Sequence, residues 1–270
     1  MQVVGVLDLL ADRAVHARGG QRSMYAPVVM VAGEPIQPGH APGLARAYVD
    51  RLGLDEIYVA DLTAIAASLE RSRHHAQTTS EPPRHASTLD GIIASGVVVW
   101  LDAGIATPDD ARHARHLGAT RVVVGLETLP SWRALEEICH LVGPGHVSFS
   151  LDLRDGAPVS SLHLVSGRTR PETIVELAAA AGVSSMIVLE LARVGTNAGP
   201  DVEMIEGLRR AVPEAALFAG GGVRGPDDLE RLADAGCEGA LVATALHDGR
   251  LGSGDIAVAR RRIGHDKLTR

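Results

Sequence analysis

Five carboxylates stand at the ends of short apolar runs in this chain. The runs read VVGVLD, IYVAD, VVVWLD, VSFSLD and MIVLE, and they end at Asp8, Asp61, Asp102, Asp152 and Glu190. Apolar runs rich in β-branched residues are typical of strands buried on both faces of a parallel sheet. The carboxyl ends of such strands share one edge, which in a β/α barrel carries the active site. Like charges gathered there raise one another's pKa and reduce stability, so the pattern indicates an enzyme or a protein that binds a polar ligand.

Two of these acids, Asp8 and Asp152, are the candidates for acid–base catalysis. They lie in the similar segments VLDL and SLDL. Two carboxyls that face each other can serve as proton acceptor and proton donor near neutral pH if their surroundings separate their pKa values. The alternative is structural, because an aspartate at a strand end can accept hydrogen bonds from backbone amides or pair with an arginine.

The segment after the first run brings further polar side chains close to Asp8. It contains two arginines, Arg18 and Arg22, and such a pair suits bidentate recognition of a carboxylate or phosphate. The alternative is that these arginines form salt bridges with the acids of the rim. The expected substrate contacts are His16, Arg18, Arg22, Asp61, Asp102, Glu190 and Thr196.

A glycine turn predicts a phosphate site. Gly220, Gly221 and Gly222 follow the seventh predicted strand, and a turn of this kind frees backbone N–H groups to hold a phosphate beside the helix start after the eighth strand. The expected phosphate-binding residues are Gly221, Gly222, Ala243 and Thr244. The equivalent position in the first half is Asp102-Ala103-Gly104, where a carboxylate would repel a phosphate dianion. We therefore expect one anion site, and none at residues 102–104.

Strand and helix signals alternate along the whole chain. The predicted strands are 2–8, 56–61, 97–102, 120–125, 146–152, 185–190, 215–219 and 239–243, and the predicted helices are 42–52, 86–95, 107–117, 131–141, 171–181, 201–211, 226–235 and 254–263. This order predicts an α/β fold, a single (β/α)8 TIM barrel over residues 1–270. An open doubly wound sheet is the alternative. We expect the long segments 16–40 and 66–90 to be loops that act as lids or contact the ligand.

An internal repeat divides the predicted barrel in two. Residues 102–128 align without a gap to residues 220–246, with Pro108 opposite Pro226. The segments YVADL and IVLEL match in the same way as VLDL and SLDL. We therefore expect two repeated half-barrels, about 1–144 and 145–270, which would place Asp8 and Asp152 opposite each other.

The composition excludes several classes of function. The chain has 270 residues and a formal net charge of −7, without the basic stripe of a nucleic-acid-binding protein, so we expect no nucleic-acid partner. No apolar run approaches the roughly 18 residues that span a bilayer, so we expect no membrane partner. The chain begins with a strand rather than a signal sequence, and the cytoplasm is the expected location.

Reactive side chains of other kinds are scarce. Cys139 and Cys237 lack metal-ligand spacing and are interpreted as free thiols of a reducing compartment. The only lysine is Lys267, near the C-terminus, which argues against Schiff-base chemistry. A Walker-type phosphate loop is absent from the sequence. The rim acids have no metal-binding spacing, so we expect neither a metal ion nor another cofactor.

Several motifs resemble the HisA/HisF family of histidine biosynthesis. They are GVLDLL, IYVADLTAI, ATRVVVGLETL, SFSLDLR, VSGR, RVGTNAG, AGGGVRGPDDLERL and ALVATAL. The resemblance covers nearly the whole chain and implies a barrel of two half-barrels. It also implies an isomerase that rearranges an aminoaldose to an aminoketose, with Asp8 at the position of the family's catalytic aspartate on strand 1 and Asp152 at that of its strand 5 aspartate.

The chain departs from that family at three motifs. Val194 stands where the family has the aspartate of a DGT motif, Asp102 stands in the first phosphate loop, and Arg168 replaces a tryptophan. One hypothesis is an isomerase or lyase that acts on a phosphorylated sugar-like or aminosugar-like substrate by acid–base catalysis. The alternative is a divergent barrel without histidine-pathway activity, which binds or converts a phosphorylated pterin or a one-carbon metabolite linked to tetrahydromethanopterin. Both hypotheses imply a small phosphorylated metabolite as the partner.

Overall fold

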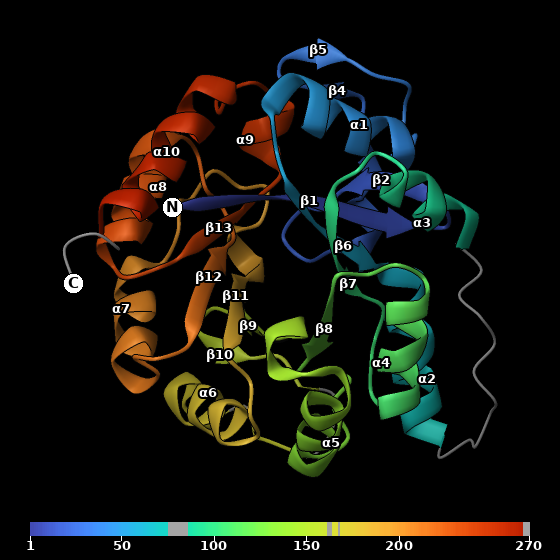
Figure 1. Ribbon diagram of the computed structural model, residues 1–270, viewed down its shortest axis with the longest axis vertical. Coiled ribbons are helices and arrows are strands. Elements are labelled where there is room, and N and C mark those ends of the chain that lie inside the picture. The colour runs from blue at the N-terminus through green and yellow to red at the C-terminus, as the bar shows by residue number, and fades with distance from the viewer. Residues whose placement is uncertain (75–85, 161–163, 167, 267–270) are drawn as a thin grey trace.

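Eight parallel strands close into a barrel in the computed structural model, which describes residues 1–74, 86–160, 164–166 and 168–266 (Figure 1). The first and last strands pair with each other, Gln2 beside Gly239, and this pairing closes the sheet. The expected TIM barrel is therefore confirmed. Its strands are β1 (Gln2–Leu10), β6 (Glu56–Asp61), β7 (Val98–Asp102), β8 (Arg121–Gly125), β9 (Val147–Arg154), β11 (Ser185–Glu190), β12 (Ala216–Gly220) and β13 (Gly239–Val242).

Helices surround the barrel at the predicted places. They are α1 (Ala41–Leu52), α3 (Ala86–Ile93), α4 (Pro108–His116), α5 (Trp132–Val142), α6 (Pro171–Ala180), α7 (Val202–Ala211), α8 (Pro226–Asp234) and α10 (Ser253–Asp266). The start of α4 shows why the prediction holds: Thr107 and Asp110 form a reciprocal capping box, and Pro108 occupies the first helical position. Within the described chain, no helix is long and apolar enough to cross a membrane.

The expectation that residues 66–90 form a loop is wrong for much of that segment. Helix α2 (Leu62–His74) begins directly after β6, and α3 begins at Ala86; residues 75–85 lie outside the described chain. The carboxylate of Asp61 accepts hydrogen bonds from the backbone N–H groups of Thr63 and Ala64, which satisfies two amides at the start of α2. A short helix, α9 (Thr244–His247), was also absent from the prediction.

Two barrel strands run past their aspartates instead of ending there. β1 continues two residues beyond Asp8 and turns back into β2 (Arg13–His16), and β9 continues beyond Asp152 and pairs with β10 (Ala157–Pro158). The predicted ends at 8 and 152 were therefore too early, because the turns lie further along the chain. The segment 16–40 adds β3 (Ala26–Pro27), β4 (Met30–Val31), β5 (Glu34–Pro35) and the 3-10 helix η1 (Arg22–Met24). Two further 3-10 helices are η2 (Pro144–His146) and η3 (Leu191–Arg193).

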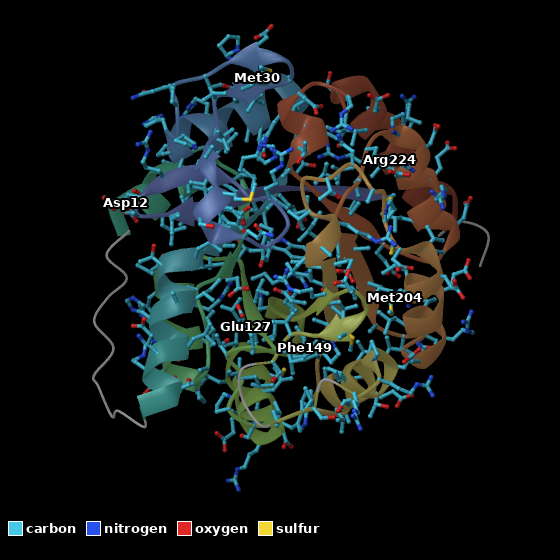
Figure 2. All side chains as sticks on the ribbon, turned by 180° about the vertical axis from the view of Figure 1, so that it is seen from behind. Asp12, Met30, Glu127, Phe149, Met204 and Arg224 are labelled. Atoms are coloured by element: carbon cyan, nitrogen blue, oxygen red, sulfur yellow. The ribbon has the colours of Figure 1, made fainter. Side chains whose placement is uncertain are left out.

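The apolar core has two layers. The larger lies between the strands and the helices, where Phe149 is fully buried, and Figure 2 shows side chains filling this space. The smaller layer fills the barrel interior, where the rings of Trp100 and Phe218 meet edge to face at 4.8 Å between centroids. These aromatic rings fill the barrel interior below the carboxyl ends of the strands. The polar residues near those ends therefore lie directly above packed apolar side chains.

Candidate functional site

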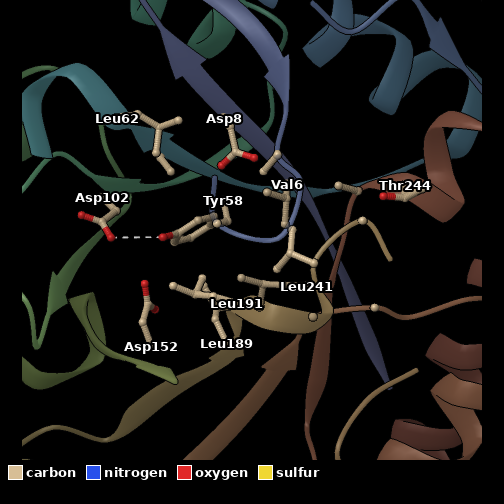
Figure 3. A pocket seen from close by; sticks show the side chains of 18 of the residues that line it. Val6, Asp8, Tyr58, Leu62, Asp102, Asp152, Leu189, Leu191, Leu241 and Thr244 are labelled. Carbon is tan, nitrogen blue, oxygen red and sulfur yellow. Dashed lines mark hydrogen bonds between the residues drawn. The ribbon is translucent and has the colours of Figure 1, made fainter. Parts of the chain in front are cut away.

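A cavity of about 240 Å³ opens at the carboxyl ends of the barrel strands. Its floor is apolar and includes Val6, Leu189 and Leu241, while its walls come from the loops after the strands. Three aspartates project into it, Asp8, Asp102 and Asp152 (Figure 3). A largely apolar pocket with a few convergent polar groups is the usual form of a small-molecule site.

The register of the strands explains why these aspartates meet. Asp8 lies beside Ala60, and Ala60 lies beside Asp102, so all three stand at one level of the barrel. Asp152 is level with Leu189, whose side chain also lines the cavity. Since side chains alternate between the two faces of a strand, residues at matching positions of neighbouring strands point to the same face.

The same alternation turns two of the predicted contacts away from the cavity. Asp61 follows the inward-facing Ala60, and Glu190 follows the inward-facing Leu189, so their side chains leave the opposite face of the sheet; neither lines the cavity. The Asp61 carboxylate accepts the backbone hydrogen bonds at the start of α2. The structure therefore corrects the expectation that all five strand-end acids share one cleft.

Glu190 is used to hold a turn. Its carboxylate accepts backbone N–H groups from Asp155 and Gly156 at 3.0 Å each and from Ala192 at 3.1 Å. These hydrogen bonds join the β9–β10 turn to the start of η3, and the side chain is buried. Glu190 thus shapes the rim of the cavity through the backbone.

Asp8 and Asp152 differ in their surroundings. Burial away from water raises the pKa of Asp8 to about 7. Burial raises the pKa of Asp152 to about 8, and the nearby Glu127 and Asp102 carboxylates raise it further. The Ser150 hydroxyl donates a hydrogen bond to Asp152 Oδ1 at 3.0 Å, which lowers this pKa. Both carboxyls therefore keep their protons to near-neutral pH, which suits groups that exchange protons with a substrate in that range.

Asp102 is held firmly in place. The Tyr58 hydroxyl donates to Oδ2 at 3.1 Å, and the Gly104 backbone N–H donates to Oδ1 at 3.2 Å. Burial raises the pKa of Asp102 to about 7, against the lowering effect of both hydrogen bonds and with a further increase from Glu127. The Asp102 carboxyl therefore stands at residues 102–104, the segment equivalent to the glycine turn at residues 220–222.

The four residues predicted to bind phosphate all line the cavity: Gly221, Gly222, Ala243 and Thr244. Gly221 and Gly222 have φ of +102° and +83°, and a Cβ on Gly221 would lie 2.6 Å from the Glu190 carbonyl oxygen. Only glycine fits that backbone path without strain. The glycine turn and the β13–α9 loop follow neighbouring strands, β12 and β13, and Figure 3 shows Thr244 of the second loop away from Asp102 and Asp152.

His16 supports this side of the cavity through another residue. Its Nε2 lies 2.8 Å from the Thr244 hydroxyl, and its ring meets that of His247 edge to face at 5.3 Å. His247 is buried, with Nε2 2.7 Å from the Tyr48 hydroxyl. Burial and the nearby Arg18 lower the pKa of His16, which favours the neutral imidazole. His16 does not line the cavity itself, so it is placed to orient Thr244.

The remaining predicted contacts lie outside the cavity lining. Arg18 is exposed, and Thr196 is exposed with its hydroxyl donating to the Arg193 carbonyl oxygen at 2.8 Å. The backbone of Arg22 belongs to η1, but its side chain lies outside the described part of the structure. Lys267, and Gly167 of the VSGR motif, also lie outside the described residues.

The first loop reaches the site through Ala17, Gly20 and Tyr25, which line the cavity, and through backbone contacts. Gly19 N–H donates to the Val194 carbonyl oxygen at 2.9 Å, and Arg154 Nη1 donates to the Gly19 carbonyl oxygen at 3.3 Å. Gly195 approaches so closely that a Cβ there would lie 2.8 Å from the Ala17 carbonyl oxygen. The first loop is thereby joined to the end of β9 and to the loop after β11.

The polar residues that line the cavity but are not among the predicted contacts are Tyr25, Tyr58, Glu127, Arg154 and Asn197. Tyr58 stands two residues before the inward-facing Ala60, and Arg154 stands two residues after Asp152. Counting in steps of two from the inward-facing residues would have found both, because that spacing keeps a side chain on one face. Glu127 follows β8, where the strand signal has already ended.

The acids of the described chain do not form a metal site. No group of three or more histidine, cysteine, aspartate or glutamate side chains in that part of the protein is arranged to hold one ion. The carboxyls of the cavity therefore face a shared space from separate strands and do not converge on one point.

Comparison with known proteins identifies related chains. A family model described as "Histidine biosynthesis protein" matches residues 2–252. The phosphoribosyl imidazole-4-carboxamide isomerase of a Thermus thermophilus strain is 26% identical, with 93% of this chain and 96% of the relative covered. The corresponding isomerase of a Synechococcus species is 28% identical over 98% of this chain and 91% of its own length. An uncharacterised protein of Methanocaldococcus jannaschii is 26% identical over 93% and 95%.

Proposed function

Because the chain belongs to the histidine biosynthesis protein family, we propose that it is an isomerase that rearranges a phosphorylated aminosugar-like substrate by acid–base catalysis. The observation that carries this proposal is the pairing of Asp8 and Asp152 in one cavity, with pKa values near 7 and 8, across from a glycine turn suited to phosphate. The family's isomerase relatives point to the same reaction class.

In this reaction the two aspartates divide the proton transfers. Asp152, whose pKa is raised by burial and by the neighbouring carboxylates, would protonate the ring oxygen of the bound aminoaldose as the bond from C1 to that oxygen breaks and a C1–nitrogen double bond forms. Asp8 would then take the proton from C2, whose bonding electrons form the C1–C2 double bond as the C1–nitrogen π electrons return to nitrogen. Protonation at C1 and loss of the O2 proton give the aminoketose, so the substrate is isomerised without any other reactant.

The glycine turn would hold the phosphate that anchors the sugar. Backbone N–H groups of Gly221 and Gly222 and the start of α9 supply donors, and Thr244 supplies a hydroxyl oriented by His16. Binding energy from a phosphate remote from the reacting carbons is the usual way to position such a substrate. A cytoplasmic location fits this kind of metabolic enzyme and is part of the proposal.

Deuterium incorporation tests this proposal directly. A panel of N-substituted 5-phosphoribosylamines would be incubated with the protein in D2O and followed by NMR. We expect a ketose product that carries deuterium at C1, and loss of that product by at least about 10²-fold in Asp8→Asn, as is typical for removal of a general base. The control is Asp50→Asn, which changes an exposed aspartate of α1. Absence of any ketose product across the panel, or full activity in Asp8→Asn, would rule the proposal out.

One residue favours a substrate outside the histidine pathway. Val194 lines the cavity at the position where the resembled family carries an aspartate. The name of the Thermus relative specifies two phosphoribosyl groups, whereas Asp102 fills the loop that would hold a second phosphate here. We therefore propose a substrate with a single phosphate. The relatives and the family match give no support to the pterin and one-carbon alternative.

A further inference from the structure

One hydrogen bond beside the proposed phosphate site joins distant parts of the chain. His16 lies in β2, and its Nε2 is 2.8 Å from the hydroxyl oxygen of Thr244, the first residue of α9. Thr244 lines the cavity and His16 does not. We propose that His16 is a positioning residue that takes up a proton when the phosphate binds: as an imidazolium it donates to Thr244, whose own hydroxyl proton is then free for the phosphate. This assignment rests on the proposed function, which sets the phosphate at the glycine turn.

The direction of this hydrogen bond decides what Thr244 can offer to a ligand. A hydroxyl has one proton to donate and two lone pairs that accept. If Nε2 of His16 is unprotonated, the Thr244 hydroxyl donates to the ring and presents only oxygen lone pairs to the cavity, which repel an anion. If Nε2 carries a proton, the ring donates and the hydroxyl proton can point to the ligand. A bound anion therefore favours the form of His16 in which Nε2 is protonated.

The charge of the ligand favours the imidazolium over a neutral ring. A phosphate monoester carries roughly two negative charges at neutral pH. Among the described residues that line the cavity, Arg154 carries the one guanidinium; it is exposed, and its Nη1 donates to the Gly19 carbonyl oxygen at 3.3 Å. The glycine turn and Thr244 have no formal charge. His16, in direct contact with Thr244, is therefore placed to supply the compensating charge.

The charged groups around His16 keep its ring mainly neutral until an anion binds. Burial and the nearby Arg18 lower the pKa of His16, whereas Asp248 raises it. Asp248 is already paired with Arg250, whose Nη2 lies 2.7 Å from its Oδ2. The ring of the free protein is thus mainly unprotonated at neutral pH, and it takes a proton from solvent when the negative charge of the ligand arrives.

The strands beside β2 add one further titratable group, Asp8. Asp8 of β1 lies beside Val15, and Ala26 of β3 lies beside His16. Burial raises the pKa of Asp8 to about 7, so this carboxyl is mainly protonated and uncharged at pH 6. At that pH the proton that accompanies the anion is therefore left to His16.

Two buried side chains support the His16 ring and do not compete for its proton. The His247 ring meets it edge to face at 5.3 Å. The Tyr48 hydroxyl donates to the Val6 carbonyl oxygen at 2.9 Å and lies 2.7 Å from His247 Nε2, so Nε2 is the donor to Tyr48. Nδ1 of His247 then carries only a lone pair, and within the described chain it has no hydrogen-bond partner. Burial lowers the pKa of His247 to about 3, so this ring stays neutral beside the imidazolium.

Proton uptake on anion binding tests this assignment. The probe is inorganic sulfate, which stays doubly charged and takes up no proton itself, measured by calorimetry from about pH 5 to 6.5 in buffers of different ionisation enthalpy. In this range Asp8, Asp102 and Asp152 largely keep their protons. We expect the parent to take up roughly 0.5 proton per sulfate at pH 6, and its affinity to fall at least about threefold from pH 5 to pH 6.5, because the bound state holds the proton more tightly.

Substitutions separate the proton carried by His16 from its place in the structure. His16→Gln keeps a side-chain N–H that can donate to Thr244 but cannot titrate, so it should bind sulfate without proton uptake and with an affinity that changes less than about twofold over this range. His16→Ala and Thr244→Val should each lose sulfate affinity at least about tenfold at pH 5, the usual effect of removing a hydrogen bond to a charged group. His140→Gln is the control, because His140 is an exposed residue of α5 outside the cavity.

The outcomes distinguish this inference from the proposed function. Sulfate binding without proton uptake in the parent at pH 6 would overturn the role of His16 and leave the phosphate anchor standing; this measurement needs no substitution. Proton uptake that persists in His16→Gln would also overturn it, since another group would then carry the proton. If neither sulfate nor inorganic phosphate binds to the parent at any pH, the proposed phosphate anchor fails, and the role of His16 fails with it.

Discussion

Replacing Asp8 by asparagine should stabilise the protein above neutral pH. Burial raises the pKa of Asp8 from 3.8 to about 7, so between these values the folded state keeps a proton that the unfolded state has released. The free energy of unfolding must then fall as pH rises through this window and level off above pH 7. Asparagine has no such ionisation, so the variant should escape this loss.

The magnitude follows from the size of the shift. A shift of about 3 pKa units corresponds to roughly 4 kcal/mol at about 1.36 kcal/mol per unit. The Asp8 side chain is only half-buried, because it faces the cavity, and water there reduces the cost. We therefore expect Asp8→Asn to be roughly 1–2 kcal/mol more stable than the parent at pH 8.5, or about 2–6 °C in melting temperature for a chain of this size, and equal to it near pH 4.

Thermal unfolding followed by circular dichroism at pH 4, 6, 7 and 8.5 would measure this difference. Asp50→Asn provides the control, since this exposed aspartate should give the same melting temperature as the parent at every pH. If Asp8 were instead the structural partner of an arginine, removal of its charge would lower the melting temperature by the equivalent of roughly 3–5 kcal/mol. A variant less stable than the parent at pH 8.5, or a difference that does not change with pH, would refute the reasoning.

Three further substitutions test the rest of the site. Asp152→Asn should lower kcat by at least about 10²-fold and remove the alkaline limb of the pH–rate profile near pH 8, since Asp152 supplies the proton. Gly221→Ala should abolish inorganic phosphate binding in calorimetry and reduce stability by roughly 1–3 kcal/mol, because of its positive φ and the nearby carbonyl oxygen; Gly145→Ala, in open space, should change neither. The parent should not restore robust growth to a strain lacking the histidine-pathway isomerase, whereas Val194→Asp should improve turnover of that enzyme's substrate, measured by chromatography; growth with the parent would contradict the role given to Val194.

The sequence predicted the barrel well because its strands are buried on both faces. Continuous apolar runs and proline-marked helix starts placed most elements within about two residues. Helix α2 (Leu62–His74) was missed because the predicted loop 66–90 rested on polar residues and prolines concentrated after Leu69, whereas residues 62–69 are mostly apolar. The division into two half-barrels stays a prediction, because it rests only on the sequence similarity between residues 102–128 and 220–246.

The site was harder to predict than the fold. The end of a strand fixes the height at which a residue lies in the barrel, but it does not tell to which face of the sheet the side chain points. Asp61 and Glu190 end their strands as Asp102 does. Each stands one residue beyond the inward-facing position of its strand, so its side chain points away from the barrel interior. Arg18 is close to Asp8 along the chain and yet exposed, whereas Arg154 arrives from the fifth barrel strand. Contacts of this kind depend on how loops fold back over the mouth, which local patterns do not encode.

The contacts that join the first loop to the end of β9 and to the loop after β11 have a kinetic consequence. Two hydrogen bonds, from Gly19 to Val194 and from Arg154 to Gly19, make these contacts. If a substrate can enter only when both break, at a net cost of roughly 1 kcal/mol each, about one molecule in thirty is open at any moment. The observed association rate would then be about thirtyfold below that of a permanently open barrel, and release of product would be slowed by the same closed population.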